Sequence, residues 1–481
     1  MTFDELCRQA PRYQVTESAD RADCDSIFVC IRGAHADGHD FAPRAYRRGC
    51  RLFAAERILD LPTDAGVICV PDTHAALAAL ACAHEEDPSR ELAVIGITGT
   101  KGKTTTALLL SHILNQNGVR CGYIGSNGID CGDGTMTATQ NTTPDAVTLQ
   151  HALRDMVRAG CRAVALEVSS QALKLGRVAG TVFDTTMFTN LSPDHIGPSE
   201  HPDFADYAAC KKRLFTDYPS QAVICNTDDP FSETIFSAAA APLKFTCSAQ
   251  RQADYTAYDA GHFRDAQTLG DAFTLRGRNA APVSCRIPLI GSGNIDNTLL
   301  AVACAAERFG ISPERSAAVL PDVRISGRSE TVALPGGALG VIDYAHNEVS
   351  LRRLLTELRA YHPGRLIVLF GSVGERTKLR RRELGAVAGE LADQAILTSD
   401  NPGREDPQAI IRDIAEGMQG FPTPHLEIPD RADAIRTAVG LLHPDDILVL
   451  AGKGHERYQL IGTEKQPFCE RDILCACTSL P

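Results

Sequence analysis

The sequence predicts an α/β protein of three domains, and three observations support this. A chain of 481 residues is too long for one compact core, so we expect two to four domains. Short apolar runs alternate with helical patterns in two separate stretches, which is typical of mostly parallel sheets covered by helices. A loop rich in glycine and threonine, "GTKGKTT" at residues 99–105, stands between an apolar run and a helical pattern.

The expected domains follow changes of pattern along the chain. Residues 1–90 mix short strands with small helices and end near a polar, proline-containing linker, "HEEDPSREL". Residues 91–326 begin with a buried strand and the helix "TTTALLLSHILNQNG", and they include a polar segment with weak strand signals at 248–286. After "ISGRSE" the alternation starts again, so residues 327–481 are expected to form a second, Rossmann-like α/β domain.

Four apolar strands of the last domain, "LGVIDYA", "RLIVLFG", "QAILTSD" and "DILVLAG", run directly into polar residues. Ligands of open α/β sheets bind beyond the carboxyl ends of the strands. Candidate ligand-binding segments are therefore residues 343–346, 371–376, 400–404 and 453–456.

The composition indicates which binding partners and which cellular compartment to expect. The formal net charge of −12 argues against a nucleic-acid surface. The 17 cysteines are spread singly through apolar stretches such as "IFVCI", which indicates reduced, buried thiols in a cytosolic protein. No apolar run is long enough to span a bilayer, and no apolar signal segment stands near the start. We expect a cytoplasmic monomer that neither binds nucleic acid nor inserts into a membrane.

The loop at residues 99–105 predicts a nucleotide site. Glycines let successive backbone N–H groups point at phosphate oxygens, and the helix N-terminus adds partial positive charge. Lys103 can reach the β- and γ-phosphates, and the Thr104 hydroxyl can ligate Mg²⁺. The usual P-loop has a glycine where this chain has Ile97, so the match is to a narrower pattern, TGTxGKT. The alternative is an ordinary capped strand–helix turn, which two lysines among three threonines disfavour.

Further motifs follow the loop in order. They are "NTTPD" at Asn141, "LEVSSQAL" at Leu166, "FTNLSPDHI" at Phe188, "YAACKKRLF" at Tyr207, and then "ISGRSE", "DYAH", "SDNPGREDP" and "AGKGHERYQ". With this ordered set the chain resembles the Mur ligases, ATP-dependent amide-forming enzymes of peptidoglycan synthesis. The later motifs narrow the resemblance to the member that adds the third residue of the peptide, and "IFVCIRGAHADGHDFAPRAYRRG" resembles its uridine-nucleotide domain.

The resemblance implies an acyl-phosphate mechanism. ATP phosphorylates the carboxylate of UDP-N-acetylmuramoyl-L-alanyl-D-glutamate, and the amine of meso-diaminopimelate or L-lysine then displaces phosphate. Bringing an anionic carboxylate to an anionic triphosphate needs concentrated positive charge. ATP and Mg²⁺ are therefore the implied cofactors, and the UDP-muramoyl dipeptide and a diamino acid are the implied substrates.

The resemblance also assigns residues to catalysis, metal and nucleotide. The implied catalytic residues are Lys103, Glu167, His195 and Lys211. The implied metal ligands are Thr104, Glu167, His195 and Lys211. ATP would contact Gly99, Thr100, Lys101, Gly102, Lys103, Thr104, Thr105, Asn294, Asn297, Arg328, Asp343 and His346. Taken singly, His195 is better interpreted as a loop histidine, whereas its place within "TNLSPDH" favours a metal ligand. Asn294 is equally well a capping residue.

Lys211 requires an explanation, because a lysine ammonium repels a metal ion. The resemblance implies that Lys211 is carbamylated, so that CO₂ converts the amine into an anion that can ligate Mg²⁺. Lys212 is adjacent and stays an alternative, as does a solvated helix lysine.

The sugar-peptide substrate would be held by a second set of residues. The resemblance implies Ser18, His35, Asn141, Thr142, Thr143, Ser169 and Arg177. Here the chain departs from the family's pattern: "EVSSQ" replaces "EVSSH", Leu175 replaces a glutamine, and "ESADR" blurs the family's "DSR".

The incoming amino acid would contact a third set. The resemblance implies Arg381, Asp400, Asn401, Arg404, Gly452 and Glu456. Diaminopimelate enzymes of the family carry "DNPR", whose arginine pairs with the distal carboxylate. This chain reads "DNPG" and then Arg404, so either Arg404 reaches the pocket or the pocket prefers lysine.

Two other hypotheses about the function also fit the sequence. One is another amide ligase of the superfamily, of folylpolyglutamate or cyanophycin type. The other is a nucleotide-binding paralogue without catalysis, which the intact set of Lys103, Thr104, Glu167, His195 and Lys211 disfavours.

Overall fold

The computed structural model describes residues 1–33, 36–194, 196–197, 200–375 and 377–478. The chain divides into two compact units. The first unit comprises Met1–Ala257, Arg276–Ala281 and Asp296–Ser316; the second comprises Tyr258–Leu275, Pro282–Ile295 and Ala317–Pro481. The domain boundaries expected after residues 90 and 326 stay predictions, while the α/β class with mostly parallel sheets is confirmed.

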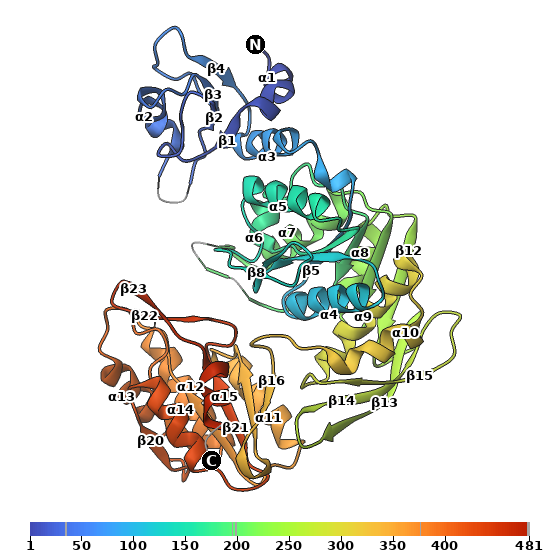
Figure 1. Cartoon of the computed structure of the whole chain (residues 1–481), viewed down its shortest axis with the longest axis vertical. Coiled ribbons are helices and arrows are strands. Elements are labelled where there is room, and N and C mark those ends of the chain that lie inside the picture. Colours follow the sequence, from blue (N-terminus) through green and yellow to red (C-terminus); the bar gives the residue numbers. More distant parts are fainter. Residues whose placement is uncertain (34–35, 195, 198–199, 376, 479–481) are drawn as a thin grey trace. The chain divides into compact units, whose positions relative to one another are not determined.

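The N-terminal residues form a small parallel sheet whose spatial order, β1-β2-β3-β4, is the chain order (Figure 1). Its strands are β1 (Gln14–Thr16), β2 (Ser26–Val29), β3 (Leu52–Ala55) and β4 (Gly66–Cys69). The associated helices are α1 (Phe3–Gln9), α2 (Ala42–Arg47) and α3 (Thr73–His84). Asp72 caps α3 by accepting hydrogen bonds from two backbone N–H groups, which satisfies donors that a helix start leaves free.

The next sheet has eleven strands in the order β15-β14-β13-β12-β11-β10-β5-β9-β6-β7-β8. They are β5 (Ala93–Thr98), β6 (Cys121–Gly125), β7 (Gly128–Asp130), β8 (Met136–Thr137), β9 (Ala163–Glu167), β10 (Thr185–Phe188), β11 (Ala222–Asn226), β12 (Leu243–Ser248), β13 (Tyr255–Arg264), β14 (Leu269–Arg276) and β15 (Val283–Ile287). The helices of this region are α4 (Lys103–Gln116), α5 (Ala146–Arg158), α6 (Ser170–Lys174), α7 (Phe204–Thr216), α8 (Phe231–Ala238), α9 (Gly293–Phe309) and α10 (Pro313–Val319). The neighbours of β5 run parallel to it, so residues that follow β5, β9 and β10 meet at one edge.

The polar segment at 248–286 forms longer strands than its weak signals suggested. β14 pairs antiparallel with β15, and the residues of β13 from Tyr258 to Gly261 are exposed. An antiparallel edge can leave one face to water, so these strands need no continuous apolar run.

The C-terminal residues form a six-stranded sheet in the order β16-β17-β21-β18-β19-β20, with only β16 antiparallel to its neighbour. Its strands are β16 (Glu330–Ala333), β17 (Leu339–Asp343), β18 (Leu366–Phe370), β19 (Gln394–Leu397), β20 (His425–Glu427) and β21 (Ile447–Ala451), and a hairpin of β22 (Tyr458–Ile461) and β23 (Glu464–Pro467) follows. Its helices are α11 (Glu348–Arg359), α12 (Lys378–Leu391), α13 (Pro407–Gly417), α14 (Arg431–Gly440) and α15 (Glu470–Thr478). The four predicted strands are thus confirmed as β17, β18, β19 and β21.

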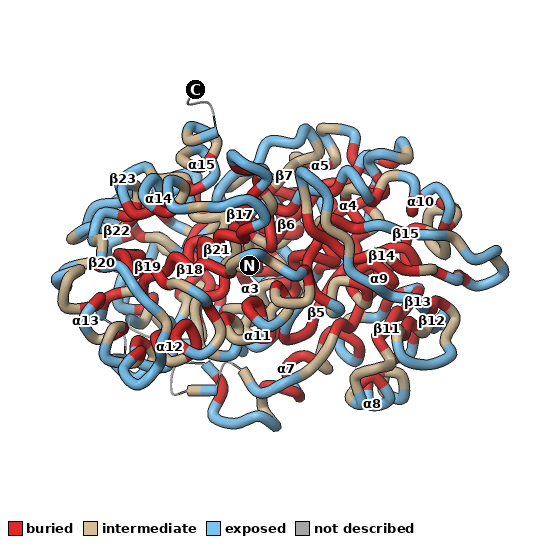
Figure 2. Tube along the Cα trace, turned by 90° about the horizontal axis from the view of Figure 1, so that it is seen from below, coloured by how far each residue is buried: buried red, intermediate tan, exposed pale blue. Residues whose placement is uncertain are grey.

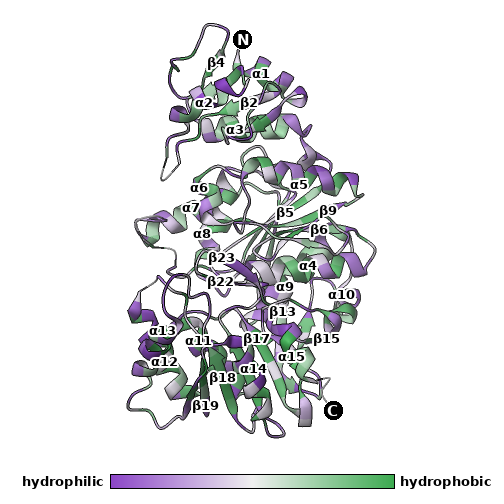
Figure 3. Ribbon diagram, turned by 60° about the vertical axis from the view of Figure 1, so that its left-hand side comes forward, coloured by the Kyte–Doolittle hydropathy of each residue, from purple (hydrophilic) through white to green (hydrophobic). Residues whose placement is uncertain are grey.

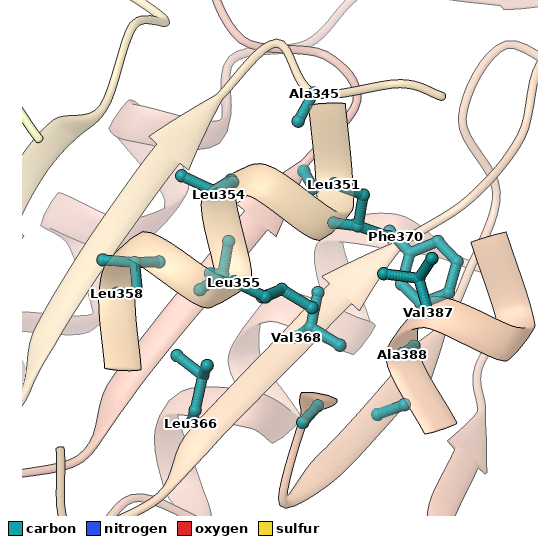
Figure 4. Packing of buried hydrophobic residues seen from close by; sticks show 14 of the residues in the cluster. Ala345, Leu351, Leu354, Leu355, Leu358, Leu366, Val368, Phe370, Val387 and Ala388 are labelled. Atoms are coloured by element: carbon teal, nitrogen blue, oxygen red, sulfur yellow. The ribbon is translucent and has the colours of Figure 1, made fainter. Parts of the chain in front are cut away.

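Strand burial explains why these runs are apolar. Residues of β18 and β21 are all buried, as the red tube in Figure 2 and the green strands in Figure 3 indicate. On one face, Leu351, Leu355 and Leu358 of α11 pack toward Val368 of β18 (Figure 4). Leucines at this spacing share one side of a helix, so a single face of α11 covers the sheet.

Short 3₁₀-helices among the described residues are Ala10–Arg12, Gly38–Phe41, Pro88–Arg90, Leu320–Asp322 and Pro335–Gly337. Across the described residues, we find no helix that is both long and apolar enough to cross a bilayer. All 17 cysteines are free thiols, and many are buried, as predicted.

Candidate active site

The glycine-rich loop connects β5, a central strand, to α4. Gly99 and Gly102 have φ of +150° and +85°, a region that favours glycine. A Cβ atom on Gly102 would lie 2.3 Å from Asn297 Oδ1, and one on Gly99 would lie 1.9 Å from Thr189 Oγ1. Both glycines are therefore required by close approach as well as by conformation.

Two lysines converge on the loop. Lys103 Nζ donates to the carbonyl oxygens of Gly99 and Thr100, at 2.9 and 3.0 Å. Lys211 Nζ, from α7, donates to the same Gly99 oxygen at 2.8 Å. The structure thus brings together two lysine side chains that lie 108 positions apart in the sequence.

Lys211 is almost fully buried, with 1% of its surface exposed. Burial lowers the pKa of Lys211 well below its usual range, and the nearby Lys103 ammonium lowers it further. The side chain also lies over the Tyr207 ring, with Nζ 4.5 Å from the ring centre. Such an amine is neutral at a lower pH than an exposed lysine, which is the form that reacts with CO₂. Lys212 is less buried, so the structure favours Lys211 over its neighbour.

Glu167 and Thr104 offer a set of oxygen atoms that suits a divalent cation. Glu167, at the end of β9, is fully buried and accepts from Thr104 Oγ1 at 2.9 Å, Tyr123 Oη at 2.7 Å and the Ser126 backbone N–H at 3.0 Å. In the part of the chain that the structure describes, these hydrogen-bond partners are all neutral. A buried carboxylate with neutral partners fits Mg²⁺, which prefers oxygen ligands.

Two predicted residues lie outside the described ones. His195 was expected to ligate the metal and His35 to contact the UDP-linked substrate; neither is described. Ser18 lies in a turn after β1, where its backbone N–H donates to Thr16 Oγ1 at 3.1 Å.

A cavity of about 250 Å³ joins the loop to the predicted sugar-peptide residues. It is lined by Lys103, Gln140, Asn141, Thr142, Ser169, Ser170, Gln171, Arg177, Glu200, His201 and Lys211. Basic side chains outnumber the single lining carboxylate, Glu200, so the cavity is suited to an anion.

Hydrogen bonds hold the substrate side of this cavity in place. Thr143 Oγ1 donates to the carbonyl oxygen of Glu167 at 2.8 Å and accepts from the Ser169 backbone N–H at 3.0 Å. Arg177 Nη1 donates to the Thr143 carbonyl oxygen at 3.0 Å. The structure therefore places Thr143, Ser169 and Arg177 together, beside the buried carboxylate of Glu167.

A ring of hydrogen bonds between α6 and α7 was not predicted from the sequence. His201 Nε2 lies 2.9 Å from Ser170 Oγ, and its Nδ1 lies 2.7 Å from Asp206 Oδ2, which also accepts from Lys174 Nζ at 3.0 Å. Cys210 brings a third ligand-type atom within 4.8 Å, but His201 and Asp206 are already bonded without an ion. No sequence signal beyond a lone histidine marked this ring.

Asn297 and Asn294 both lie on α9 but differ in their contacts. Asn297 Oδ1 accepts from Thr106 Oγ1 at 3.2 Å, against the start of α4. Asn294 Nδ2 donates to the Ile290 carbonyl oxygen at 2.8 Å, as a helix start can. A nucleotide role for either residue stays a prediction.

In the second unit, the remaining predicted nucleotide residues gather after β17. Burial raises the pKa of Asp343, whose carboxylate accepts from the Ser329 backbone N–H at 2.8 Å. The Arg328 guanidinium lies 5.4 Å from the centre of the Tyr344 ring, and its buried Nε has no hydrogen-bond partner among the described residues. His346 Nδ1 lies 2.8 Å from the Tyr344 carbonyl oxygen.

The predicted amino-acid residues separate into two groups. Asp400, Asn401 and Glu456 surround the buried Lys453, and a Cβ on Gly452 would lie 2.8 Å from Asp400 Oδ2. Lys453 was within a candidate segment but was not assigned a role.

Arg381 and Arg404 lie in different surroundings. Arg381 is buried and pairs with both carboxylate oxygens of Glu405, at 2.7 and 2.6 Å, and with Asp413 at 2.9 Å. Arg404 is exposed, with no hydrogen-bond or ion-pair partner in the described chain. Gly403 has φ of +58°, so the backbone turns there in a way that disfavours a side chain.

A glycine-rich strand–helix loop beside a buried lysine, a buried carboxylate and a cavity suited to an anion is typical of a nucleotide-dependent group-transfer enzyme. Family models describe the two larger parts of the chain. Residues 97–305 match the Mur ligase middle domain, and residues 327–454 match the Mur ligase, glutamate ligase domain. The chain belongs to the Mur ligase family and is an ATP-dependent acid–amino-acid ligase.

Curated relatives are similar over nearly their full length. Proteins of Chlorobaculum tepidum, Geobacillus kaustophilus and Xanthomonas campestris are 38%, 39% and 40% identical, cover 94%, 93% and 92% of this chain, and are covered to 91%, 91% and 88%. Each is named UDP-N-acetylmuramoyl-L-alanyl-D-glutamate--2,6-diaminopimelate ligase.

Solved structures share the fold. A ligase of the same name has a TM-score of 0.70 at 28% identity, over 97% of this chain and 94% of that one. MurF from Acinetobacter baumannii has a TM-score of 0.63 at 18% identity, over 100% and 99%. Folylpolyglutamate synthase of Mycobacterium tuberculosis has a TM-score of 0.60 at 18% identity, over 78% and 91%. The last two likenesses concern the fold alone.

Proposed function

We propose that this enzyme adds meso-diaminopimelate to UDP-N-acetylmuramoyl-L-alanyl-D-glutamate, using ATP, in the cytoplasmic synthesis of peptidoglycan precursors. One observation carries the proposal: relatives 36% to 40% identical, which match 92% to 94% of this chain, bear the name of that ligase. The cavity supports it, because an anionic glutamyl carboxylate needs cations where it meets ATP.

Two groups of cavity residues would have different roles. Lys103 and Lys211 stand at the loop end, where the phosphoryl group would transfer. Asn141, Ser169 and Arg177 line the opposite side, where the sugar-peptide would be held. Binding both reactants in one enclosed space raises their effective concentration and keeps water from the acyl phosphate.

Mg²⁺ would be held by Thr104 and Glu167, with Lys211 as a carbamate and His195 completing the set. When bound, the ion supplies positive charge to the phosphate oxygens. The chain's own contribution is a buried carboxylate, oriented by Tyr123 and Ser126, whose described partners are neutral.

The identity of the amino acid depends on one side chain. A diaminopimelate site needs a cation for the distal carboxylate, because a buried carboxylate without one costs several kcal/mol. Arg381 is already bound to two carboxylates, whereas Arg404 is unpaired in the described chain. We therefore infer that Arg404 binds the distal carboxylate of diaminopimelate, and that the backbone turn at Gly403 brings Arg404 to it.

The proposal is tested by a substrate panel. Wild-type protein and Arg404→Ala are incubated with ATP, Mg²⁺, the UDP-muramoyl dipeptide, and either meso-diaminopimelate or L-lysine, and the products are weighed by mass spectrometry. We expect diaminopimelate addition by the wild type and its loss in the variant, with ATP binding unchanged. Efficient lysine addition with inert diaminopimelate would instead assign the other specificity.

A further inference from the structure

A buried lysine stands at the centre of the amino-acid cluster. Lys453 follows β21 and has no exposed surface. Its Nζ donates to Asn401 Oδ1 and Glu456 Oε2, both at 3.0 Å, and lies 3.7 Å from Asp400 Oδ1. We propose that Lys453 is a positioning residue that orients Glu456 to bind an ammonium group of the incoming diamino acid. This inference rests on the proposed function.

The hydrogen bonds leave one carboxylate oxygen of Glu456 available. Oε2 accepts from Lys453 and also from Asn401 Nδ2, at 2.9 Å. Oε1 has no partner among the described residues, and the side chain is 17% exposed. A carboxylate fixed through one oxygen presents the other in a constant direction, which suits a charge-assisted bond to an ammonium group.

Asn401 serves the same arrangement. Its Oδ1 accepts from Lys453 and from the Leu460 backbone N–H at 2.9 Å, and its Nδ2 donates to Glu456. The residue is nearly buried and most of its bonding capacity is used within the protein. Asn401 therefore acts with Lys453 on Glu456, and the substrate-facing group of this trio is Glu456.

The charge of the cluster explains why the central residue is a lysine. Asp400 and Glu456 contribute two carboxylates, and Lys453 supplies the cation between them. Removing that cation would leave two carboxylates close together without a counter-charge, which weakens their fixed geometry. The remaining single negative charge is what an ammonium group requires.

Lys453→Met tests the proposal, because methionine keeps an unbranched chain and removes the charge. Lys465→Met is the matched control: both lysines lie over the Tyr458 ring, with Nζ at 5.6 Å for Lys453 and 4.3 Å for Lys465, but Lys465 is exposed and bonds neither Asn401 nor Glu456. We expect KM for the diamino acid to rise about tenfold or more in Lys453→Met, with KM for ATP and the UDP-linked substrate unchanged. Lys465→Met should match the wild type.

A double variant separates positioning from general packing. If Lys453 acts through Glu456, adding Glu456→Gln to Lys453→Met raises KM no further, whereas independent effects would multiply. Should Lys453→Met fail to fold, Asn401→Ala provides the test, because it removes the other bond that holds Glu456, and the same selective rise in KM is expected. If the wild type adds the diamino acid and Lys453→Met leaves KM for the diamino acid unchanged, this inference alone is overturned. A wild type that adds none overturns the proposed function and this inference together.

Discussion

At the scale of single residues, burial decides which of two adjacent lysines is chemically distinct. Lys211 and Lys212 are consecutive on α7, yet only Lys211 is almost fully enclosed. Burial penalises the charged form of Lys211 and lowers its pKa well below the usual range.

Carbamylation of Lys211 is the first prediction. Because its amine loses its proton at a lower pH than an exposed lysine, it should react with CO₂ at neutral pH. Carbon-13 NMR of protein held in labelled bicarbonate should show one slowly exchanging carbamate signal that Lys211→Ala removes. Lys212→Ala is the control and should keep both the signal and full ligase activity; a signal that follows Lys212 would assign the modification to the other lysine.

Residue identity could be predicted best where short motifs constrain the chemistry. The loop glycines, Lys103, Thr104 and Glu167 were predicted from sequence and lie together in the structure. Lys453 and His201 were not assigned, because a single lysine or histidine carries no pattern. Each also has one partner that is distant in sequence: Asn401 lies 52 positions from Lys453, and Ser170 lies 31 positions from His201.

At the scale of elements, the junction of β5 and α4 requires glycine for two separable reasons. Gly102 directly precedes α4 with φ +85°, and a Cβ atom there would meet Asn297. Gly118 follows the other end of the same helix with φ +81°, and a Cβ atom there would have nothing within 4 Å. Both glycines have a positive φ, but a Cβ atom would meet a neighbouring side chain only at Gly102 and would lie in open space at Gly118.

Replacing Gly102 with alanine should impair nucleotide binding. Both Gly102→Ala and Gly118→Ala incur about 1–2 kcal/mol from the left-handed conformation. Only Gly102→Ala also displaces Asn297, so its KM for ATP should rise about tenfold or more. Gly118→Ala should lose a similar amount of stability and keep its KM. Equal KM values in the two variants would contradict a close fit between loop and nucleotide.

The contact between α12 and the loop that precedes α13 should weaken at acid pH. Hydrogen bonds from Arg381 lower the pKa of Glu405 to about 2, from an ordinary value of 4.5. Stability from this pair is therefore complete above pH 4.5 and is lost as the pH falls toward 2. With allowance for the partial exposure of Glu405, Glu405→Gln should cost on the order of 1–2 kcal/mol at pH 6.

Urea unfolding at pH 6 and at pH 3 measures this effect. The difference between wild type and Glu405→Gln should shrink at the lower pH. Glu416→Gln is the control, because Glu416 of α13 pairs with Arg382, the neighbour of Arg381 on α12, with Arg382 and Glu416 side chains 61% and 48% exposed. Its effect should stay under about 1 kcal/mol at both pH values. A Glu405 effect of constant size would refute the assigned pKa.

At the scale of the whole molecule, ligands should stabilise the folded chain through the sites described. A non-hydrolysable ATP analogue with Mg²⁺ at 100 times its Kd should add about 2.7 kcal/mol, because it binds the folded state alone. Thermal unfolding should show a higher Tm for the wild type and a much smaller shift for Lys103→Met, whose loop lacks the phosphate-facing cation. An equal shift in both proteins would place the nucleotide elsewhere.

The sequence by itself determined the α/β class, the four strands of the C-terminal sheet, and the position of the phosphate loop. These depend on local properties, namely apolar runs, helix starts and glycine at a strand end. Such properties can be read directly from the amino-acid sequence. The lengths of β13 and β14 were underestimated, because strands near the antiparallel edge of a sheet can leave one face to water.

Only the tertiary structure decided which side chains are available to a ligand. Arg381 and Arg404 were both expected to contact the amino acid, but folding pairs Arg381 with Glu405 and Asp413 and leaves Arg404 exposed. In the same way, folding encloses Lys453 among Asp400, Asn401 and Glu456. Charge pairing and burial depend on residues distant in sequence, so no local pattern can predict which cation is already bound and which remains for the substrate.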